Sequence, residues 1–129
     1  MSLDPHNLLA DVHPDLVKVI TTASQSQPFE VISGIRTLAT EEANVARGAS
    51  QTLHSRHLPD NNFGGKACAV DIMCLDDTGH GSWDVLLYKA AAVNIKTAAA
   101  NAHVPVEWGG DWHSLKDFTH WQLPWASYP

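Results

Sequence analysis

The chain has 129 residues, of which 44% are hydrophobic and 17% are charged, a balance that is typical of one compact globular domain and leaves no room for two. Eight basic and fourteen acidic residues give a formal net charge of −6, and the lysines and arginines form no cluster that could follow a phosphate backbone. We therefore expect neither nucleic acid nor an anionic membrane as a partner. Apolar runs end well before the roughly twenty residues of a transmembrane helix, so we also expect no membrane insertion.

The amino-terminal residues 1–6 lack the basic start and the apolar core of a secretory signal peptide. We therefore expect synthesis in the cytoplasm without a signal peptide. The two cysteines, Cys68 and Cys74, would lie roughly 20 Å apart on one extended strand, which is far beyond disulfide reach. We expect both thiols to be reduced and buried.

Two elements are predicted in the first part of the chain. Pro14 can occupy the first turn of a helix, because apolar residues recur at helical spacing from Leu16 until Gln25–Pro28 ends the run. The stretch Phe29–Ile35 is rich in β-branched and aromatic residues and predicts a strand that leads up to Arg36.

A short helix and a long loop are predicted next. Thr40 can cap a helix over 41–47, whose first turn is acidic and which stops at Gly48. Residues 50–66 contain proline, asparagine and paired glycines, and this composition predicts a loop.

The stretch Ala67–Met73 predicts a strand with two different faces. One face carries residues suited to a core: Cys68, Val70, Ile72 and Cys74. Asp71 lies on the other face, between Ala69 and Met73. We therefore expect this carboxylate to point away from the main apolar layer.

The longest predicted helix covers roughly Trp83–Ala102, and Ser82 can cap it. Its predicted buried stripe consists of Leu86, Leu87, Ala90, Ala91, Ile95 and Ala98. Short strands are predicted over Val106–Gly110 and His120–Leu123, with a polar loop between them. Helices that lie mainly outside a small, largely antiparallel sheet define an α+β fold class.

Three separated pieces of the chain carry residues suited to chemistry: Ser55–His57, Ala69–Asp71 and Asp117–His120. Together they offer two imidazoles and a carboxylate, a normal set of three protein ligands for a catalytic zinc that keeps its fourth position for water. A closed structural site would want four ligands, usually rich in cysteine, and the cysteines here lie on the wrong face of the strand. Hydrolysis also needs a group that moves the proton of the water, and Asp117 is the candidate.

The order Ser-x-His, Ala-x-Asp and an acid three residues before a final histidine resembles the zinc D-alanyl-D-alanine carboxypeptidases and the related phage L-alanyl-D-glutamate endopeptidase endolysins. Ser33–Arg36 is similar to the arginine-bearing strand end of that family, and Glu107–Trp112 is similar to its tryptophan-glycine motif. The resemblance spans most of the chain and implies the small α+β fold of these zinc peptidases.

The resemblance also implies a role for each matching residue. His57, Asp71 and His120 would bind one zinc ion (Zn²⁺). Asp117 would act as the general base and then as the general acid. Arg36 would hold the substrate or stabilise the oxyanion.

The sequence departs from the family pattern in two ways. Fourteen positions separate His57 from Asp71 where the family commonly has seven, which predicts an inserted loop over 59–65. Such a loop is thermodynamically mild, because its entropic cost grows only with the logarithm of its length. Some relatives carry glutamate as the base, so Glu107 competes with Asp117, which we favour because it lies three residues before a predicted ligand.

Four side chains near these motifs have two interpretations. Trp108 and Trp112 can line the substrate groove or close a small core. Ser55 can hydrogen-bond the substrate or satisfy a loop backbone. His54 forms a His-x-x-His pair with His57, but the resemblance assigns only the second histidine to the metal.

The function implied by the resemblance is zinc-dependent hydrolysis of the L-alanyl–D-glutamate bond in the peptidoglycan stem peptide. We expect residues 1–129 to form a single catalytic domain with no separate cell-wall-binding domain, and to act as a monomer. By the same resemblance, the enzyme would be made in the cytoplasm of a phage-infected host and released to the cell wall by a separate membrane-permeabilising protein. The alternatives are a D-alanyl-D-alanine carboxypeptidase or dipeptidase with the same metal site, a non-catalytic zinc-containing wall-binding module, and a metal-free protein.

Overall fold

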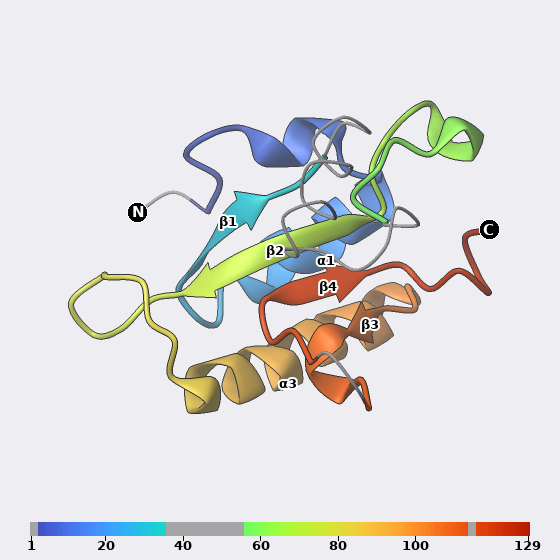
Figure 1. The fold of residues 1–129 in the computed structure, drawn as a ribbon. Coiled ribbons are helices and arrows are strands. Elements are labelled where there is room, and N and C mark those ends of the chain that lie inside the picture. Colours follow the sequence, from blue (N-terminus) through green and yellow to red (C-terminus); the bar gives the residue numbers. More distant parts are fainter. Residues whose placement is uncertain (1–2, 36–55, 114–115) are drawn as a thin grey trace.

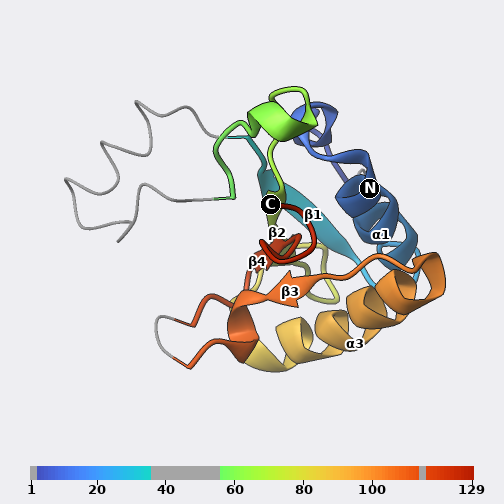
Figure 2. The same cartoon turned by 90° about the vertical axis from the view of Figure 1, so that its right-hand side faces the viewer.

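The computed structural model describes residues 3–35, 56–113 and 116–129, and within them the chain forms a four-stranded sheet covered by helices. The strand order is β1 (Phe29–Ser33), β2 (Ala69–Cys74), β4 (His120–Gln122) and β3 (Glu107–Trp108), and every neighbouring pair is antiparallel. Helices α1 (Pro14–Ala23) and α3 (Val85–Ala102) pack against each other and cover one face of this sheet (Figures 1 and 2). The predicted α+β class with a small antiparallel sheet is confirmed.

Helix α1 begins and ends as the sequence predicts. Pro14 stands at its first position, and the ring of His13 accepts a hydrogen bond from the Asp15 backbone N–H, which caps the first turn. Its buried residues recur at helical spacing and face the sheet: Leu16, Val19, Ile20 and Ala23.

Strand β2 lies in the middle of the sheet and has the two faces that its alternating sequence predicts (Figure 1). Its inner face is fully buried against the helices and carries Val70, Ile72 and Cys74. Asp71 on the outer face is only partly buried. Cys68 and Cys74 are both free and buried, so the prediction of reduced, buried thiols is confirmed.

The predicted start and buried stripe of the long helix were partly wrong. Asp84, not Ser82, caps α3, because its carboxylate accepts the Leu86 backbone N–H and the helix begins at Val85. The stripe is rotated, so that Leu86 is 70% exposed and Ala90 is also exposed. The residues that face the core are Tyr88, Ala91, Ala92, Ile95, Ala98 and Ala99.

Tyr88 is the physical reason for this rotation. Its hydroxyl accepts a hydrogen bond from the Cys74 backbone N–H and donates one to the Ser82 carbonyl, so the ring must point inward. A residue two positions away on a helix points about 200° around the axis, which turns Leu86 toward solvent. The buried stripe predicted from the sequence contained only aliphatic residues and therefore left Tyr88 out.

Two segments contain short 3-10 turns that the sequence did not predict, and one predicted helix is not tested by the structure. Residues Asn61–Phe63 in the predicted inserted loop form a 3-10 turn that Asp60 caps. Residues Gly109–Asp111 form another, so the strand predicted to reach Gly110 ends at Trp108. The helix predicted over 41–47 lies outside the described residues. In the parts of the chain that the structure describes, no helix combines the length and apolarity that crossing a membrane requires.

Candidate metal centre

The three predicted metal ligands meet on the outer face of the sheet, although they are far apart in the sequence. His57 Nε2 lies 3.3 Å from Asp71 Oδ2, and His120 Nδ1 lies 3.3 Å from Asp71 Oδ1. The two ring nitrogens, His57 Nε2 and His120 Nδ1, are 3.2 Å apart. These three residues are a group that could hold a metal ion.

Strand pairing explains how two of the three ligands meet. Asp71 on β2 is the register partner of His120 on β4, and partners in adjacent antiparallel strands project from the same face of a sheet. Ser33 at the end of β1 is the partner of Asp71 on its other side. The chain continues from Ser33 into Gly34, whose carbonyl oxygen lies 2.7 Å from His57 Nδ1. The end of β1, the middle of β2 and the start of β4 therefore converge on the candidate centre.

Arg56, which the sequence analysis did not single out, attaches the third ligand to the sheet. Its carbonyl accepts the Cys68 backbone N–H just before β2. Its buried guanidinium donates to the carbonyls of Leu123 and Tyr128, which follow β4. The segment that carries His57 is thus held between β2 and the carboxyl-terminal segment. A basic residue beside a predicted ligand was the signal available in the sequence.

The spacing of the two ring nitrogens is that of ligands around a small tetrahedral ion. With bonds of about 2.0–2.1 Å, ligand atoms around zinc lie about 3.3–3.4 Å apart. The two ring nitrogens are 3.2 Å apart, and each lies 3.3 Å from a different oxygen of Asp71. With one ligand atom from each residue, the three atoms lie within 4.8 Å of one another. His57 Nδ1 must carry its proton, because it donates to the Gly34 carbonyl, and Nε2 therefore presents a lone pair to the centre. The donor set fits zinc in its atom types, in the spacing of its ring nitrogens and in this tautomer.

Electrostatics keep the carboxylate of the group ionised. Burial alone would raise the pKa of Asp71, but hydrogen bonding with His120 and His57, and the charge that these rings carry when they are protonated, outweigh burial, so its pKa lies far below the usual range. Burial alone would lower the pKa of His120, but the hydrogen bond and charge of Asp71, with smaller contributions from Gln122 and Asp117, hold it above its usual value. Asp71 is therefore in its carboxylate form, the form in which it could bind a cation.

Asp117, the predicted proton-transfer residue, lies beside this group on the turn that enters β4. Its Oδ1 accepts hydrogen bonds from both the backbone N–H and the hydroxyl of Thr119, which orients the carboxylate. Its backbone N–H donates to Gly109, where a Cβ would overlap the Asp117 carbonyl. Asp117 also lines a cavity of about 230 Å³ together with Trp83, Val85, Tyr88, Lys116, Phe118 and Thr119. None of the three candidate ligands lines this cavity.

Glu107, the competing candidate for the base, is engaged on the other side of His120. Its Oε2 accepts hydrogen bonds from the indole N–H of Trp112 at 3.2 Å and from the side-chain amide of Gln122 at 3.0 Å. The Trp112 ring centroid lies 5.1 Å from that of His120. The amide oxygen of Gln122, a residue that sequence reasoning missed, lies 2.8 Å from His120 Nε2.

The remaining predicted site residues fall into two groups. Trp108 is buried in the core, stacks on Trp121 at 5.8 Å and donates its indole N–H to the Phe118 carbonyl. This placement matches the packing interpretation of Trp108, and its contact with substrate stays a prediction. Arg36 and Ser55 lie outside the described residues.

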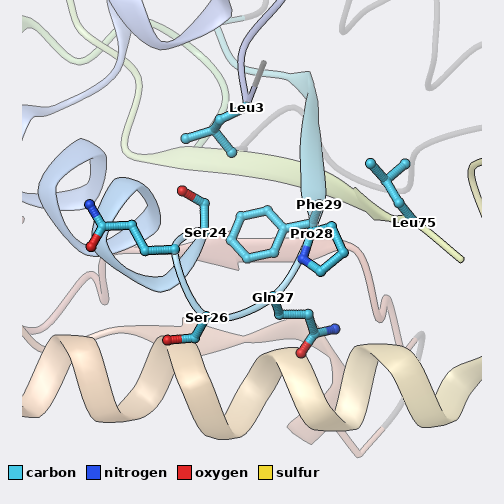
Figure 3. Close-up of a pocket in the computed structure, with 8 residues that line it drawn as sticks. Leu3, Ser24, Ser26, Gln27, Pro28, Phe29 and Leu75 are labelled. Atoms are coloured by element: carbon cyan, nitrogen blue, oxygen red, sulfur yellow. The ribbon is translucent and has the colours of Figure 1, made fainter. Parts of the chain in front are cut away.

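A larger cavity of about 330 Å³ lies where α1 is joined to β1, at the other end of β1 from the candidate centre (Figure 3). Its walls are formed by Leu3, Ser24, Gln25, Ser26, Gln27, Pro28, Phe29 and Leu75. These side chains include no carboxylate, imidazole, thiol or amine. The cavity therefore offers neither a metal ligand nor a group for proton transfer, whereas His57, Asp71 and His120 could hold a metal ion.

A three-ligand His–Asp–His group beside an oriented carboxylate, on a small antiparallel sheet, is the arrangement of a metallopeptidase. Residues 1–122 match the family model described as phage L-alanyl-D-glutamate peptidase, and the chain belongs to this family. The resemblance found in the sequence is confirmed.

Two similar proteins support the same family. The L-alanyl-D-glutamate peptidase of Listeria phage A118 is 32% identical over 130 residues, which cover 98% of this chain. This chain spans 42% of the length of that relative. The crystal structure of the L-Ala D-Glu endopeptidase ChiX of Serratia marcescens superposes with a TM-score of 0.85 at 41% identity, covering 95% of this chain and 87% of that one. The fold of the described residues is therefore that of an L-Ala-D-Glu endopeptidase.

Proposed function

We propose that this protein is a zinc-dependent peptidase that hydrolyses the L-alanyl–D-glutamate bond of the peptidoglycan stem peptide. The observation that carries the proposal is the convergence of His57, Asp71 and His120 at separations of 3.2 and 3.3 Å. Family membership supports the choice of peptide bond, because the family and both relatives bear the name of this activity.

Zinc is the metal that the donor set favours. Two imidazoles and one carboxylate are typical of catalytic zinc sites, in which the fourth position is left to water. Cys68 and Cys74 are buried on the core side of the sheet and cannot serve as a fourth ligand on the outer face. When bound, zinc would supply a water with a pKa of about 7 and would polarise the scissile carbonyl.

Asp117 would carry the proton through the reaction. As a general base it takes the proton from the attacking water, and as a general acid it delivers that proton to the departing nitrogen of D-glutamate. The two hydrogen bonds from Thr119 to Oδ1 support this role, because they hold the carboxylate in one orientation.

Three further residues would bind substrate. We assign Arg36 to the developing negative charge on the scissile carbonyl, since it follows Gly34 by two residues and the Gly34 carbonyl contacts His57. Trp112 lies against His120 and would form part of the groove wall. Ser55, two residues before a ligand, would hydrogen-bond the peptide.

The biological setting follows from the family. The enzyme would be synthesised in the cytoplasm of an infected bacterium, act as a monomer, and reach the peptidoglycan after a separate membrane-permeabilising protein has opened the inner membrane. The residues 1–129 would form one catalytic domain. Purified protein is then expected to clear cells whose outer membrane has been stripped, and inactivity of zinc-loaded protein on such cells would contradict this setting.

Digestion of purified peptidoglycan, with mass spectrometry of the products, tests the proposed reaction. We expect free L-alanine carboxyl ends and new amino-terminal D-glutamate from wild type, and neither from His120→Ala. His6→Ala serves as the matched control, because His6 is exposed. Release of D-alanine alone would instead identify a carboxypeptidase, and full zinc occupancy without any product would identify a non-catalytic wall-binding module.

A further inference from the structure

We propose that Glu107 is a positioning residue that, acting through Gln122, fixes which nitrogen of His120 faces the metal. This inference rests on the proposed zinc site. It gives Glu107 a function other than that of the catalytic base, for which it competes with Asp117 in the sequence.

The three side chains form a continuous line across two strands. Glu107 on β3 is the register partner of Gln122 on β4, and His120 lies two residues before Gln122 on the same strand. All three therefore project from the same face of the sheet. The Gln122 amide nitrogen lies 3.0 Å from Glu107 Oε2, and the Gln122 amide oxygen lies 2.8 Å from His120 Nε2.

The Glu107 carboxylate fixes the orientation of the Gln122 side-chain amide. An ionised carboxylate only accepts hydrogen bonds, so the NH₂ end of Gln122 must face Glu107 and its oxygen must face His120. His120 Nε2 must then carry a proton, which leaves a lone pair on Nδ1. That Nδ1 lies 3.2 Å from His57 Nε2 and 3.3 Å from Asp71 Oδ1. The line of contacts therefore selects the tautomer that can bind a metal at the centre.

The two histidines obtain their tautomers in different ways. His57 donates to the Gly34 backbone carbonyl, which can only accept, so no further residue is needed. His120 faces a side-chain amide, which could present either its oxygen or its NH₂ group if nothing constrained it. Glu107 removes this ambiguity. Groups that orient a metal-binding histidine in this way typically contribute about 10–100-fold to metal affinity.

The contacts of Glu107 also separate it from proton transfer. Trp112 and Gln122 both donate to the same oxygen, Oε2, which holds the carboxylate as an acceptor. The full length of the Gln122 side chain lies between Glu107 and His120. Asp117, by contrast, lines an open cavity.

Zinc affinity of Glu107→Gln is the first test, measured by competition with a chromogenic chelator. The substituted amide has the shape of the carboxylate but can donate as well as accept, so Gln122 is free to turn around. We expect about 10–100-fold weaker zinc binding than wild type. Glu30→Gln is the matched control, a partly buried glutamate in edge strand β1, and it should bind zinc as wild type does.

The double variant Glu107→Gln with Gln122→Glu provides the rescue. The carboxylate then sits at position 122, where it accepts the His120 Nε2–H directly, while the new amide at 107 donates to it. We expect zinc affinity to return to within about threefold of wild type, a difference of under 1 kcal/mol. A failure of folding in the single variant would also be repaired here, because the same hydrogen-bonding groups are present in exchanged positions.

Nitrogen-15 NMR of the His120 ring supplies a readout that a merely structural role would not move. Zinc-loaded wild type and the double variant should show a protonated Nε2 and a metal-bound Nδ1, whereas Glu107→Gln should show a mixed population. Unchanged zinc affinity and tautomer in Glu107→Gln would overturn the inference, and so would unchanged affinity with abolished turnover, which would make Glu107 the base. Wild type that binds no zinc would overturn the proposed metal site itself, and this result needs no variant.

Discussion

The two faces of strand β2 carry residues of different kinds, apolar core residues on one and a charged residue on the other. The inner face carries Val70, Ile72 and Cys74, which are fully buried against the helices. The outer face carries Asp71, which meets two histidines at 3.3 Å. The inner residues stabilise the fold through apolar burial, a property that other side chains of similar volume also have. The proposed role of Asp71 depends on one charge at one position, so we expect this residue to tolerate fewer substitutions.

This difference predicts that stability and metal binding separate according to face. A substitution on the outer face removes a polar group that contacts the other residues of the candidate centre and does not pack in the apolar layer. A substitution on the inner face leaves a cavity between β2 and the helices, while the three predicted ligands keep their positions on the outer side of the sheet. The experiments below test this separation, beginning with the largest expected effect.

His120→Ala should abolish metal binding and activity together. Removal of one of three protein ligands should weaken zinc binding by more than about 100-fold, beyond the loss caused by a group that only orients a ligand. Product release should fall to background, whereas the far-ultraviolet circular dichroism of the metal-free variant should match that of metal-free wild type. One zinc per chain in this variant, measured by inductively coupled plasma mass spectrometry, would show that His120 is not a ligand.

Asp117→Asn should separate the chemistry from the metal. The amide keeps the shape of the side chain but cannot accept a proton, so we expect full zinc content and a rate lower by about two to four orders of magnitude. Initial rates of peptide release from purified peptidoglycan, normalised to zinc content, provide the measurement. A variant with the wild-type rate would exclude Asp117 as the proton-transfer residue.

Ile72→Ala probes the inner face of the same strand, one residue from Asp71. The side chain is fully buried, so its truncation should lower the free energy of unfolding by about 2–5 kcal/mol. Chemical denaturation of the metal-free protein measures this loss. Below its melting temperature the variant should still bind one zinc with wild-type affinity. A weakened metal site with unchanged stability would break the comparison between the two faces.

Tyr128 lies outside β2, and its hydroxyl, which contacts Asp15, is separate from its carbonyl, which contacts Arg56. Burial, and then the 2.7 Å hydrogen bond that its hydroxyl donates to Asp15, raise its pKa to about 12. Because the folded pKa lies above the unfolded value, the associated stability is complete below about pH 10 and is lost as the pH rises through about 12. Asp15→Asn should lower this pKa without changing zinc content, and ultraviolet titration of phenolate absorbance measures it. Zinc loss in Asp15→Asn would contradict the independence of the two regions.

The sequence predicted the candidate centre best where local periodicity decides the outcome. Asp71 follows from the alternation of β2, and its neighbours in the centre follow from the ordered motifs that carry the family resemblance. The position of α1 could be predicted equally well, because the proline at its start and the spacing of its apolar residues are local features. Local patterns of this kind survive folding because each depends on only a few adjacent residues.

Features that depend on contacts between distant segments were missed or wrong. The rotation of α3 depends on the hydroxyl of Tyr88 reaching Cys74, fourteen residues earlier. The contact between Glu107 and Gln122 depends on the pairing of β3 with β4. Strand β3 has two residues, which are too few for a sequence pattern to predict this pairing. Arg56 contacts the chain 67 and 72 residues away. Such partners become visible only when the strand order is known.

X-ray absorption spectroscopy of the zinc-loaded protein tests the central claim most directly. We expect one zinc per chain, surrounded only by nitrogen and oxygen at about 2.0–2.1 Å, with the outer-shell scattering of two imidazole rings. A sulfur neighbour at about 2.3 Å would place the metal on the cysteine side of the sheet, and a spectrum without two imidazoles would separate the ion from His57 and His120. Either result would contradict the account.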